Sequence, residues 1–302
     1  MGASILELRA DNLELGLVPE LGGSVAYFRK RTEGGNVDLF RPLSERDHAA
    51  NDILGVAMFP MVPYANCIED NAFDFEGQRY RVEPNLPGYK FNFHGRGWRS
   101  EWKATTVESR RATLELRDDG PEQPHRYLAV QQFVLENGRL IVGASISNLG
   151  PRRMPFGFGQ HPWFPRRDET YIKFRARQFW IESVDSSATE AITIPPELDF
   201  SSMRPPPVVR RNNCYGEWSG SAEITWPGEG VGLRITADPI FRQLMVYFPA
   251  PPTDAFCLEP QTNLISALTR IGRAAAPQDL GLIVLEPGQS ASGEIVFAPF
   301  DV

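Results

Sequence analysis

Residues 127–148 read YLAVQQFVLENGRLIVGASISN and contain the clearest fold signal in the sequence. Apolar and polar residues alternate along two arms, which are separated by Glu136, Asn137 and Gly138. Alternation with a period of two is typical of β-strands, and an Asn-Gly pair between two such arms is the strongest short hairpin signal. The stretch therefore predicts two antiparallel strands joined by a tight turn.

The sequence on either side repeats this pattern in shorter segments. Alternating runs punctuated by Gly, Pro or Asn lie at residues 6–28, 111–117, 222–226, 232–237, 243–248 and 293–297. Residues 73–81 alternate around Glu76-Gly77 and predict a second tight hairpin. Residues 264–271 have a weakly helical pattern. The sequence therefore predicts an all-β fold class.

Two segments depart from the pattern. Residues 52–66 (DILGVAMFPMVPYAN) are apolar but contain Pro60 and Pro63. These prolines exclude a continuous helix or a central strand through both, so we expect an ordered loop packed on the core. Residues 195–207 are rich in proline and serine, but similar strand patterns flank them on both sides. We therefore predict a single domain over residues 1–302 rather than a linker between two domains.

The composition, with 42% hydrophobic and 23% charged residues, is typical of a globular protein. The formal net charge of −7 argues against nucleic acid or an anionic membrane as a partner, because no basic excess exists to neutralise phosphates. Cys67, Cys214 and Cys257 are far apart and lack CxxC spacing, which favours a reducing compartment. With no signal-peptide pattern and no run of about 18 apolar residues, we expect a cytoplasmic protein.

Residues 156–164 read FGFGQHPWF and place His161 among glycines and aromatic rings, two residues before Trp163. An imidazole beside aromatic surfaces suits a ligand that has apolar faces and polar edges, such as a sugar. A core histidine whose nitrogens bond to the backbone is the alternative interpretation of this stretch.

Two further residues extend the candidate site. His94 lies in FNFHGRGW, and Glu259 lies in FCLEPQTN after an apolar approach that limits solvation of its carboxylate. Together with His161 they form a candidate acid/base set. Metal binding is a competing use of these residue types, but HxH and HExxH spacing is absent. A GxSxG nucleophile turn is absent as well.

These residues belong to a wider resemblance. The motifs that carry it are residues 63–66 (PYAN) with Ile68, residues 74–77 (DFEG), 93–95 (FHG), 160–164 (QHPWF), 213–215 (NCY) and 257–260 (CLEP). In this order they are similar to the aldose 1-epimerase (galactose mutarotase) family. The resemblance implies an antiparallel β-supersandwich with a concave sugar site, and no metal or organic cofactor.

The resemblance also implies roles for individual residues. Glu259 matches the general base that takes the proton from the C1 hydroxyl of the sugar, and His161 matches the general acid that protonates the ring oxygen. His94 matches a histidine that holds the sugar and stabilises charge at the reacting oxygens. The residues expected to line the sugar are Asn66, Arg96, Trp163, Asn212 and Gln261.

The sequence departs from the family pattern at two positions that would hold sugar hydroxyls. Cys67 stands where the family usually has an arginine, and Asn212 stands where many members have an aspartate. Arginines near the motifs (Arg96, Arg99 and the pair at 166–167) raise an alternative, which is a mutarotase for a phosphorylated or other anionic sugar. A sugar-binding module without turnover is a further alternative. We expect a monomer or a homodimer.

Overall fold

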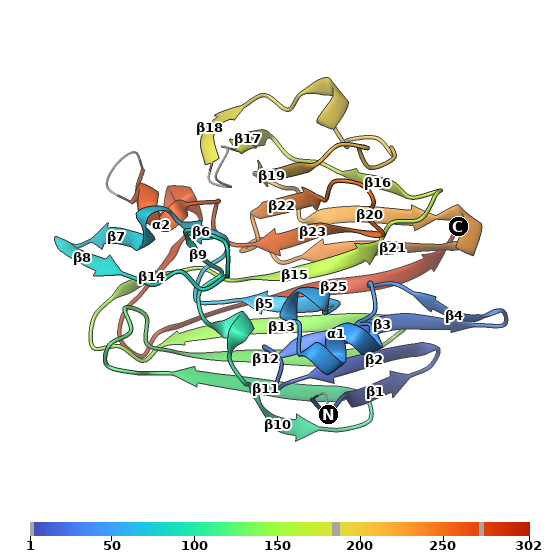
Figure 1. Cartoon of the computed structure of the whole chain (residues 1–302), viewed down its shortest axis with the longest axis horizontal. Helices are drawn as coiled ribbons and strands as arrows, with labels where there is room; N and C mark the ends of the chain where they lie inside the picture. The colour runs from blue at the N-terminus through green and yellow to red at the C-terminus, as the bar shows by residue number, and fades with distance from the viewer. Residues whose placement is uncertain (1–2, 183–187, 272–274) are drawn as a thin grey trace.

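Two large antiparallel sheets, of 11 and 8 strands, dominate the computed structural model, which describes residues 3–182, 188–271 and 275–302. The strands of both sheets run in roughly the same direction across Figure 1, as they do in a β-sandwich. In order of pairing, the larger sheet consists of β1 (Leu6–Ala10), β2 (Leu13–Val18), β3 (Ser24–Thr32), β5 (Met58–Met61), β15 (Gly159–Pro165), β23 (Ala255–Gln261), β22 (Gln243–Phe248), β19 (Arg211–Gly216), β17 (Gln178–Glu182) and β18 (Ala188–Ile192), with β4 (Gly35–Asp38) beside β3.

The smaller sheet packs against the larger one. In order of pairing it consists of β10 (Lys103–Val107), β11 (Arg111–Asp118), β12 (Tyr127–Glu136), β13 (Arg139–Asn148), β25 (Ser290–Asp301), β21 (Val231–Ala237), β20 (Ser221–Trp226) and β16 (Tyr171–Phe174). Gln131 of β12 forms hydrogen bonds with Gln160 of β15 and with the carbonyl of Gly23. An apolar core drawn from both sheets includes Leu8 near one end of the chain and Phe297 near the other. The all-β prediction is therefore confirmed.

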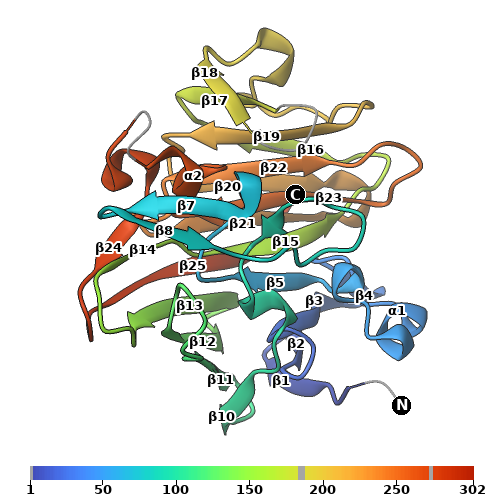
Figure 2. The same ribbon diagram turned by 60° about the vertical axis from the view of Figure 1, so that its left-hand side comes forward.

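Shorter elements complete the described chain. Strands also pair as β6 (Cys67–Ile68) with β9 (Asn92–Phe93), β7 (Ala72–Phe75) with β8 (Gln78–Arg81), and β14 (Met154–Phe156) with β24 (Ile283–Leu285). The helices are α1 (Glu45–Ala50), α2 (Ala267–Arg270) and the 3-10 turns Ile53–Gly55, Glu69–Asn71, Gly97–Arg99, Pro196–Leu198, Pro227–Glu229 and Pro277–Leu280. Helix α2 lies beside β7 at one end of the sandwich (Figures 1 and 2). In the described parts of the chain, no helix is long and apolar enough to span a membrane.

Both predicted hairpins are present. Strands β12 and β13 pair from Tyr127 opposite Asn148 to Glu136 opposite Arg139. The turn between them has positive φ at Asn137 (51°) and at the following glycine (69°), as a type I′ turn requires. Strands β7 and β8 form the second hairpin in the same way.

The prediction of a loop over residues 52–66 is wrong for Met58–Met61, which form β5 inside the larger sheet. The register between β5 and β3 is Val25 opposite Met58, so Pro60 lies beyond the point where these strands pair. On the other side Pro60 lies opposite Gln160 of β15. A proline without an N–H is tolerated where the neighbouring strand has diverged.

The proline-rich residues 195–207 contribute to the core. Leu198 and Phe200 are buried, and the Phe200 ring stacks on Phe174 of β16 with centroids 5.1 Å apart. The Tyr215 hydroxyl donates a hydrogen bond to the Leu198 carbonyl at 2.9 Å. The segment is thus packed against the sheets rather than extended as a linker.

Candidate active site

Two neighbouring strands of the larger sheet, β15 and β23, bring His161 and Glu259 together. Trp163 lies opposite Cys257 in their antiparallel pairing. Two residues along, the same register places His161 opposite Glu259. On its other side His161 lies opposite Phe59 of β5. Sheet register therefore joins two residues that are far apart in the sequence.

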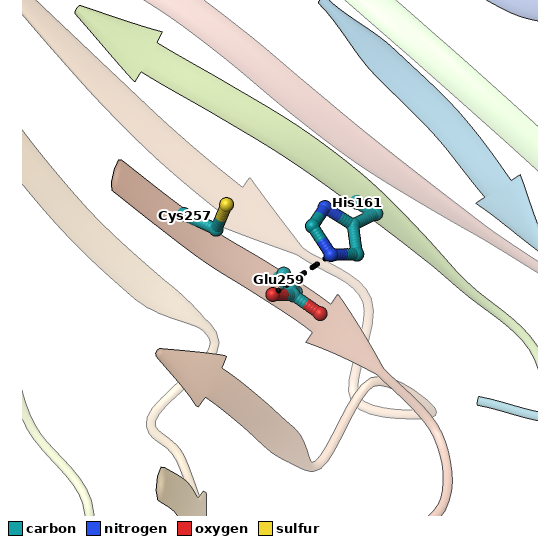
Figure 3. A group of neighbouring side chains, drawn as sticks. All are labelled: His161, Cys257 and Glu259. Carbon is teal, nitrogen blue, oxygen red and sulfur yellow. Dashed lines mark ion pairs between the residues drawn. The ribbon is translucent and has the colours of Figure 1, made fainter. Parts of the chain in front are cut away.

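The alternation of side chains determines which face carries the site. The Gln160 side chain donates a hydrogen bond from Nε2 to Oε1 of Gln131 in β12 at 3.0 Å, so Gln160 points between the two large sheets. Its neighbour His161 therefore points to the outer face of the larger sheet. Figure 3 shows Cys257 and Glu259 on the same side of β23, with the His161 ring reaching toward the carboxylate.

His161 and Glu259 form a buried acid/base pair. His161 Nε2 lies 3.3 Å from Glu259 Oε1, and the two residues are only 8% and 2% exposed. Burial lowers the pKa of His161 well below its usual value, and burial raises the pKa of Glu259 well above its usual value. With two protons or with none, the pair would place a net charge in a desolvated site. Burial therefore favours the state in which the pair shares one proton.

His94 lies next to this pair and is held by the backbone of Asn66. The backbone N–H of Asn66 donates to the ring nitrogen Nδ1 of His94 at 3.0 Å, and the backbone N–H of His94 donates to the Asn66 carbonyl at 2.9 Å. Burial lowers the pKa of His94 to about 3, so the ring is neutral. Because Nδ1 accepts a hydrogen bond, Nε2 carries the proton and is a hydrogen-bond donor. The His94 and His161 ring centroids are 5.6 Å apart, at an interplanar angle of 89°.

Asn66 and Gln261, both expected to bind substrate, contact each other. The Asn66 Nδ2 group donates to Gln261 Oε1 at 2.8 Å, and Gln261 Nε2 donates to the carbonyl of Asn263 at 2.7 Å. Gln261 lies on the same face of β23 as Glu259, two residues further along the strand. The pair of amides therefore borders the candidate site and fixes the segment that holds His94.

Aromatic rings surround His161. Phe59 stacks on His161 with centroids 4.3 Å apart, and Trp163 lies at 5.4 Å. The guanidinium of Arg41 lies 4.4 Å from the Trp163 ring centroid and donates hydrogen bonds to two backbone carbonyls. Among the described residues, Trp163 Nε1 has no hydrogen-bond partner. Trp163 can therefore offer an apolar ring surface to a ligand.

Asn212 lies on the same face, further across the sheet. It lies opposite Tyr247, which in turn lies opposite Cys257. Asn212 Nδ2 donates to Glu182 Oε1 at 3.0 Å, and Arg210 binds the same carboxylate through two hydrogen bonds of 2.7 and 2.8 Å. Asn212 thus stands at the margin of the site with its amide nitrogen already engaged.

The structure does not bring Arg96 to the acid/base pair. Arg96 Nε lies 3.3 Å from Asp118 Oδ2, and Arg96 and Arg99 line a separate cavity whose wall includes neither His161 nor Glu259. The arginines at 166–167 are engaged elsewhere, with the carbonyls of Pro207 and Asp38 and with the Glu229 carboxylate. The arginines that suggested an anionic sugar therefore have other partners.

Three potential metal ligands meet at the site. The ligand atoms of His161, Cys257 and Glu259 lie within 4.8 Å of one another, which sequence spacing did not reveal because they come from two strands. Metal-bound histidines usually donate their second ring N–H to a carbonyl or carboxylate. His161 Nδ1 has no such partner in the described chain, and burial raises the pKa of the Cys257 thiol. The donor set therefore fits zinc poorly.

Sequence reasoning missed three residues of this face. Phe59 lies in the segment assigned to a loop, so its contact with His161 depends on the unforeseen strand β5. Tyr247 packs edge-on against Trp163 at 5.8 Å. Gln243 lies opposite Gln261, is 5% exposed, and has no hydrogen-bond partner for Oε1 within the described residues. Of these three residues, only Gln243 had a sequence signal, because it is a polar residue at the start of the alternating run at 243–248.

Comparison with known proteins shows the family of this chain. The family model for aldose 1-epimerase matches residues 4–298. The uncharacterized protein YphB of Escherichia coli K12 is 31% identical over 285 residues, which cover 92% of this chain and 93% of the relative. An Escherichia coli K12 crystal structure provisionally named an aldose 1-epimerase superimposes with a TM-score of 0.90 at 28% identity, over 99% of both chains.

A more distant structure has the same fold. The GalM/aldose epimerase homologue from C. elegans superimposes with a TM-score of 0.82 at 17% identity, over 99% of both chains. The family match spans nearly the whole chain, and it includes both sheets and every strand that contributes to the acid/base pair. This protein therefore belongs to the aldose 1-epimerase family.

Proposed function

We propose that this protein is a cofactor-independent mutarotase that interconverts the α and β anomers of an aldose. The observation that carries the proposal is the 3.3 Å separation of His161 Nε2 and Glu259 Oε1. Anomer exchange requires an acid and a base at two oxygens that are bonded to the same carbon. In glycoside hydrolases, by contrast, the two carboxyl groups stand about 5–9.5 Å apart.

The proposed reaction moves only protons and one ring bond. In the reactive form of the pair the proton resides on His161, and Glu259 is a carboxylate. Glu259 takes the proton of the C1 hydroxyl, the bond between C1 and the ring oxygen breaks, and His161 protonates that oxygen. The aldehyde then turns about the C1–C2 bond. Ring closure on its other face returns the proton from the C5 hydroxyl to His161 and the proton of Glu259 to the new C1 hydroxyl.

His94 would assist without changing its charge. Its neutral ring can present the Nε2 proton to an oxygen on which negative charge develops, because Asn66 occupies Nδ1. A fixed donor in a desolvated site stabilises developing charge without reorganisation. In this proposal His161 transfers the proton, whereas His94 binds the sugar and polarises the oxygen on which charge develops.

The substrate we propose is a neutral aldose. Arg41 donates to two backbone carbonyls, and Arg210 is paired with Glu182. Arg270 lies 5.1 Å from the centroid of the Trp180 ring. Trp180 is on β17, three strands from Glu259 on β23, which corresponds to about 14 Å at the usual strand spacing. The face thus offers aromatic rings and amides to a sugar, and its nearest cations are already engaged. For the three free and buried cysteines, a reducing cytoplasmic setting is the natural one.

Exchange spectroscopy by NMR tests the proposal. Glucose, galactose and xylose, together with the 6-phosphate and 6-carboxylate derivatives of the first two, are equilibrated and their anomeric exchange rates are measured with increasing protein. We expect an exchange rate that rises linearly with protein concentration for at least one neutral aldose. No acceleration for any sugar would refute the mutarotase assignment, whereas acceleration confined to the anionic sugars would refute neutral selectivity alone.

A further inference from the structure

A cavity of about 920 Å³ borders the segment that carries His94. Tyr64, Asn92 and Gly95 line it, but neither His161 nor Glu259 does. Its size falls within the range of small-molecule sites. The cavity is therefore separate from the proposed acid/base pair, and its interpretation does not depend on the proposed function.

Two buried polar groups in this cavity lack hydrogen bonds. Tyr127 of β12 lies directly opposite Asp118 of β11, which makes their side chains neighbours on the sheet. Tyr127 is 1% exposed, and within the described residues its hydroxyl has no hydrogen-bond partner. Asp118 Oδ2 is likewise buried without a hydrogen bond, although Arg96 Nε lies 3.3 Å away. Buried polar atoms of this kind are rare because desolvation without a partner is costly.

The unused hydrogen-bonding capacity defines the chemistry of a ligand. The Asp118 oxygen can only accept a hydrogen bond, and the Tyr127 hydroxyl can donate or accept. A third group, the Tyr64 hydroxyl, donates to Asn92 Oδ1 at 2.7 Å, so its oxygen is still able to accept. One ligand group that both donates and accepts satisfies such a set, and a hydroxyl is that group.

The charges around the cavity balance. Its ionised lining residues are three arginines and three carboxylates: Arg81, Arg96, Arg99, Glu83, Asp118 and Glu122. A lining with equal numbers of both signs does not select an ion. The ring of Tyr89, which also lines the cavity and is 53% exposed, offers an aromatic surface for the apolar face of a ligand.

We propose that this cavity is a second binding site, specific for a neutral polyhydroxylated molecule, in which ligand hydroxyls bond to Tyr127 and Asp118. The ligand is either a cyclic sugar or an acyclic polyol, since both present vicinal hydroxyls without charge. The site binds the ligand without chemical change, because His161 and Glu259 lie outside it.

Hydrogen–deuterium exchange with mass spectrometry tests the proposal. Maltose and sorbitol are the probes, titrated separately to saturation, so that the two arms distinguish cyclic from acyclic ligands. We expect one or both to slow amide exchange at residues 81–89 and 118–127, independently of any protection at residues 159–163 and 255–261. The midpoint is the ligand concentration that gives half of the maximal protection at residues 81–89 and 118–127. It should rise about two- to tenfold in Tyr127→Phe and about ten- to a hundredfold in Asp118→Asn.

Tyr215→Phe is the matched control for the loss of a hydroxyl. Tyr215 is also buried, but its hydroxyl donates to the Leu198 carbonyl, so the change should leave the midpoint at residues 81–89 and 118–127 unaltered. Tyr127→Phe removes a hydroxyl that has no partner in the described chain, and we expect it to fold as the parent does. Absence of protection at these segments by both probes, or an unchanged midpoint in both cavity variants, would overturn the proposal and leave water as the occupant.

Discussion

Glu259 and His161 illustrate how a single proton sets the state of a buried pair. The form with the proton on Glu259 and the form with the proton on His161 have the same proton count, and 3.3 Å separates the two atoms. In the proposed mechanism, the second form is the one that starts ring opening. Burial is therefore compatible with the role proposed for Glu259, because the proton that this role requires it to lose has an acceptor beside it.

The first prediction concerns the carboxylate. Glu259→Gln should keep the fold and sugar binding but lower the anomer exchange rate by about 10²–10⁴-fold, because an amide of the same shape cannot accept the proton. The measurement is NMR exchange spectroscopy at saturating sugar. Glu14→Gln is the matched control, since Glu14 is also buried in the larger sheet but forms an ion pair with Arg29 at 2.7 Å. An exchange rate in Glu259→Gln equal to that of Glu14→Gln would exclude Glu259 as the base.

The second prediction concerns pH. A second proton on the pair must reside beside a neutral carboxyl, and burial, which lowers the pKa of His161, opposes it. Loss of the last proton leaves a buried carboxylate, which burial likewise opposes by raising the pKa of Glu259. The pH profile of kcat/KM, corrected for spontaneous exchange, should therefore be a bell. Its acid limb should lie well below the usual pKa of histidine, and its alkaline limb should lie well above the usual pKa of glutamate. An acid limb at the usual pKa of histidine, or an alkaline limb at the usual pKa of glutamate, would contradict the one-proton pair.

At the scale of the element, β23 places Cys257, Glu259 and Gln261 on one face with a spacing of two residues. The third prediction follows from this strand. If the reaction moves only protons, prolonged treatment with a strong chelator should leave the exchange rate unchanged. Cys257→Ser, which removes the soft metal ligand, should also retain the parental rate within about twofold. Loss of activity in both experiments, with recovery on adding zinc to the chelated protein, would show that His161, Cys257 and Glu259 hold a metal.

Some elements were predictable from the sequence and others were not. The β12–β13 hairpin could be located because alternation and Asn137-Gly138 are local signals that act within a few residues. Strand β5 was not found, because Pro60 is a local signal against a strand, whereas the divergence of β3 that makes it tolerable is a property of the sheet.

At the scale of the whole molecule, the site depends on contacts that sequence spacing does not encode. Local motifs singled out His161, His94 and Glu259 as candidates, but their proximity comes from the register of β15 with β23 and from the bonds between Asn66 and His94. Arg96 is close to His94 in the sequence yet lines the cavity of about 920 Å³, away from the acid/base pair. The chain between them turns through left-handed conformations at His94 and the following glycine (φ of 57° and 67°). Sequence proximity was therefore a poor guide to the arginines.

The last prediction concerns the stability of the molecule in acid. Two of its four histidines, His94 and His125, are buried so that their pKa values fall to about 3 and about 4. The unfolded chain, in which histidine has a pKa near 6.5, binds more protons than the folded chain between that pH and the folded pKa. Stability is therefore fully present above about pH 6.5 and falls as the pH decreases, by about 1.4 kcal/mol per pH unit for each histidine.

His125 allows this effect to be isolated, because it lies outside the proposed acid/base pair. Its Nε2 is 2.8 Å from the Pro155 carbonyl, and in His125→Gln the amide can still donate to that oxygen but does not titrate. Urea unfolding at pH 8, 7 and 5 measures the free energy of unfolding. The difference in the free energy of unfolding between parent and variant should be constant from pH 8 to 7, whatever packing the substitution alters. Between pH 7 and 5 the parent should lose about 2 kcal/mol more than the variant. Equal losses would mean that His125 is protonated in the folded protein, and that its burial does not contribute to acid sensitivity.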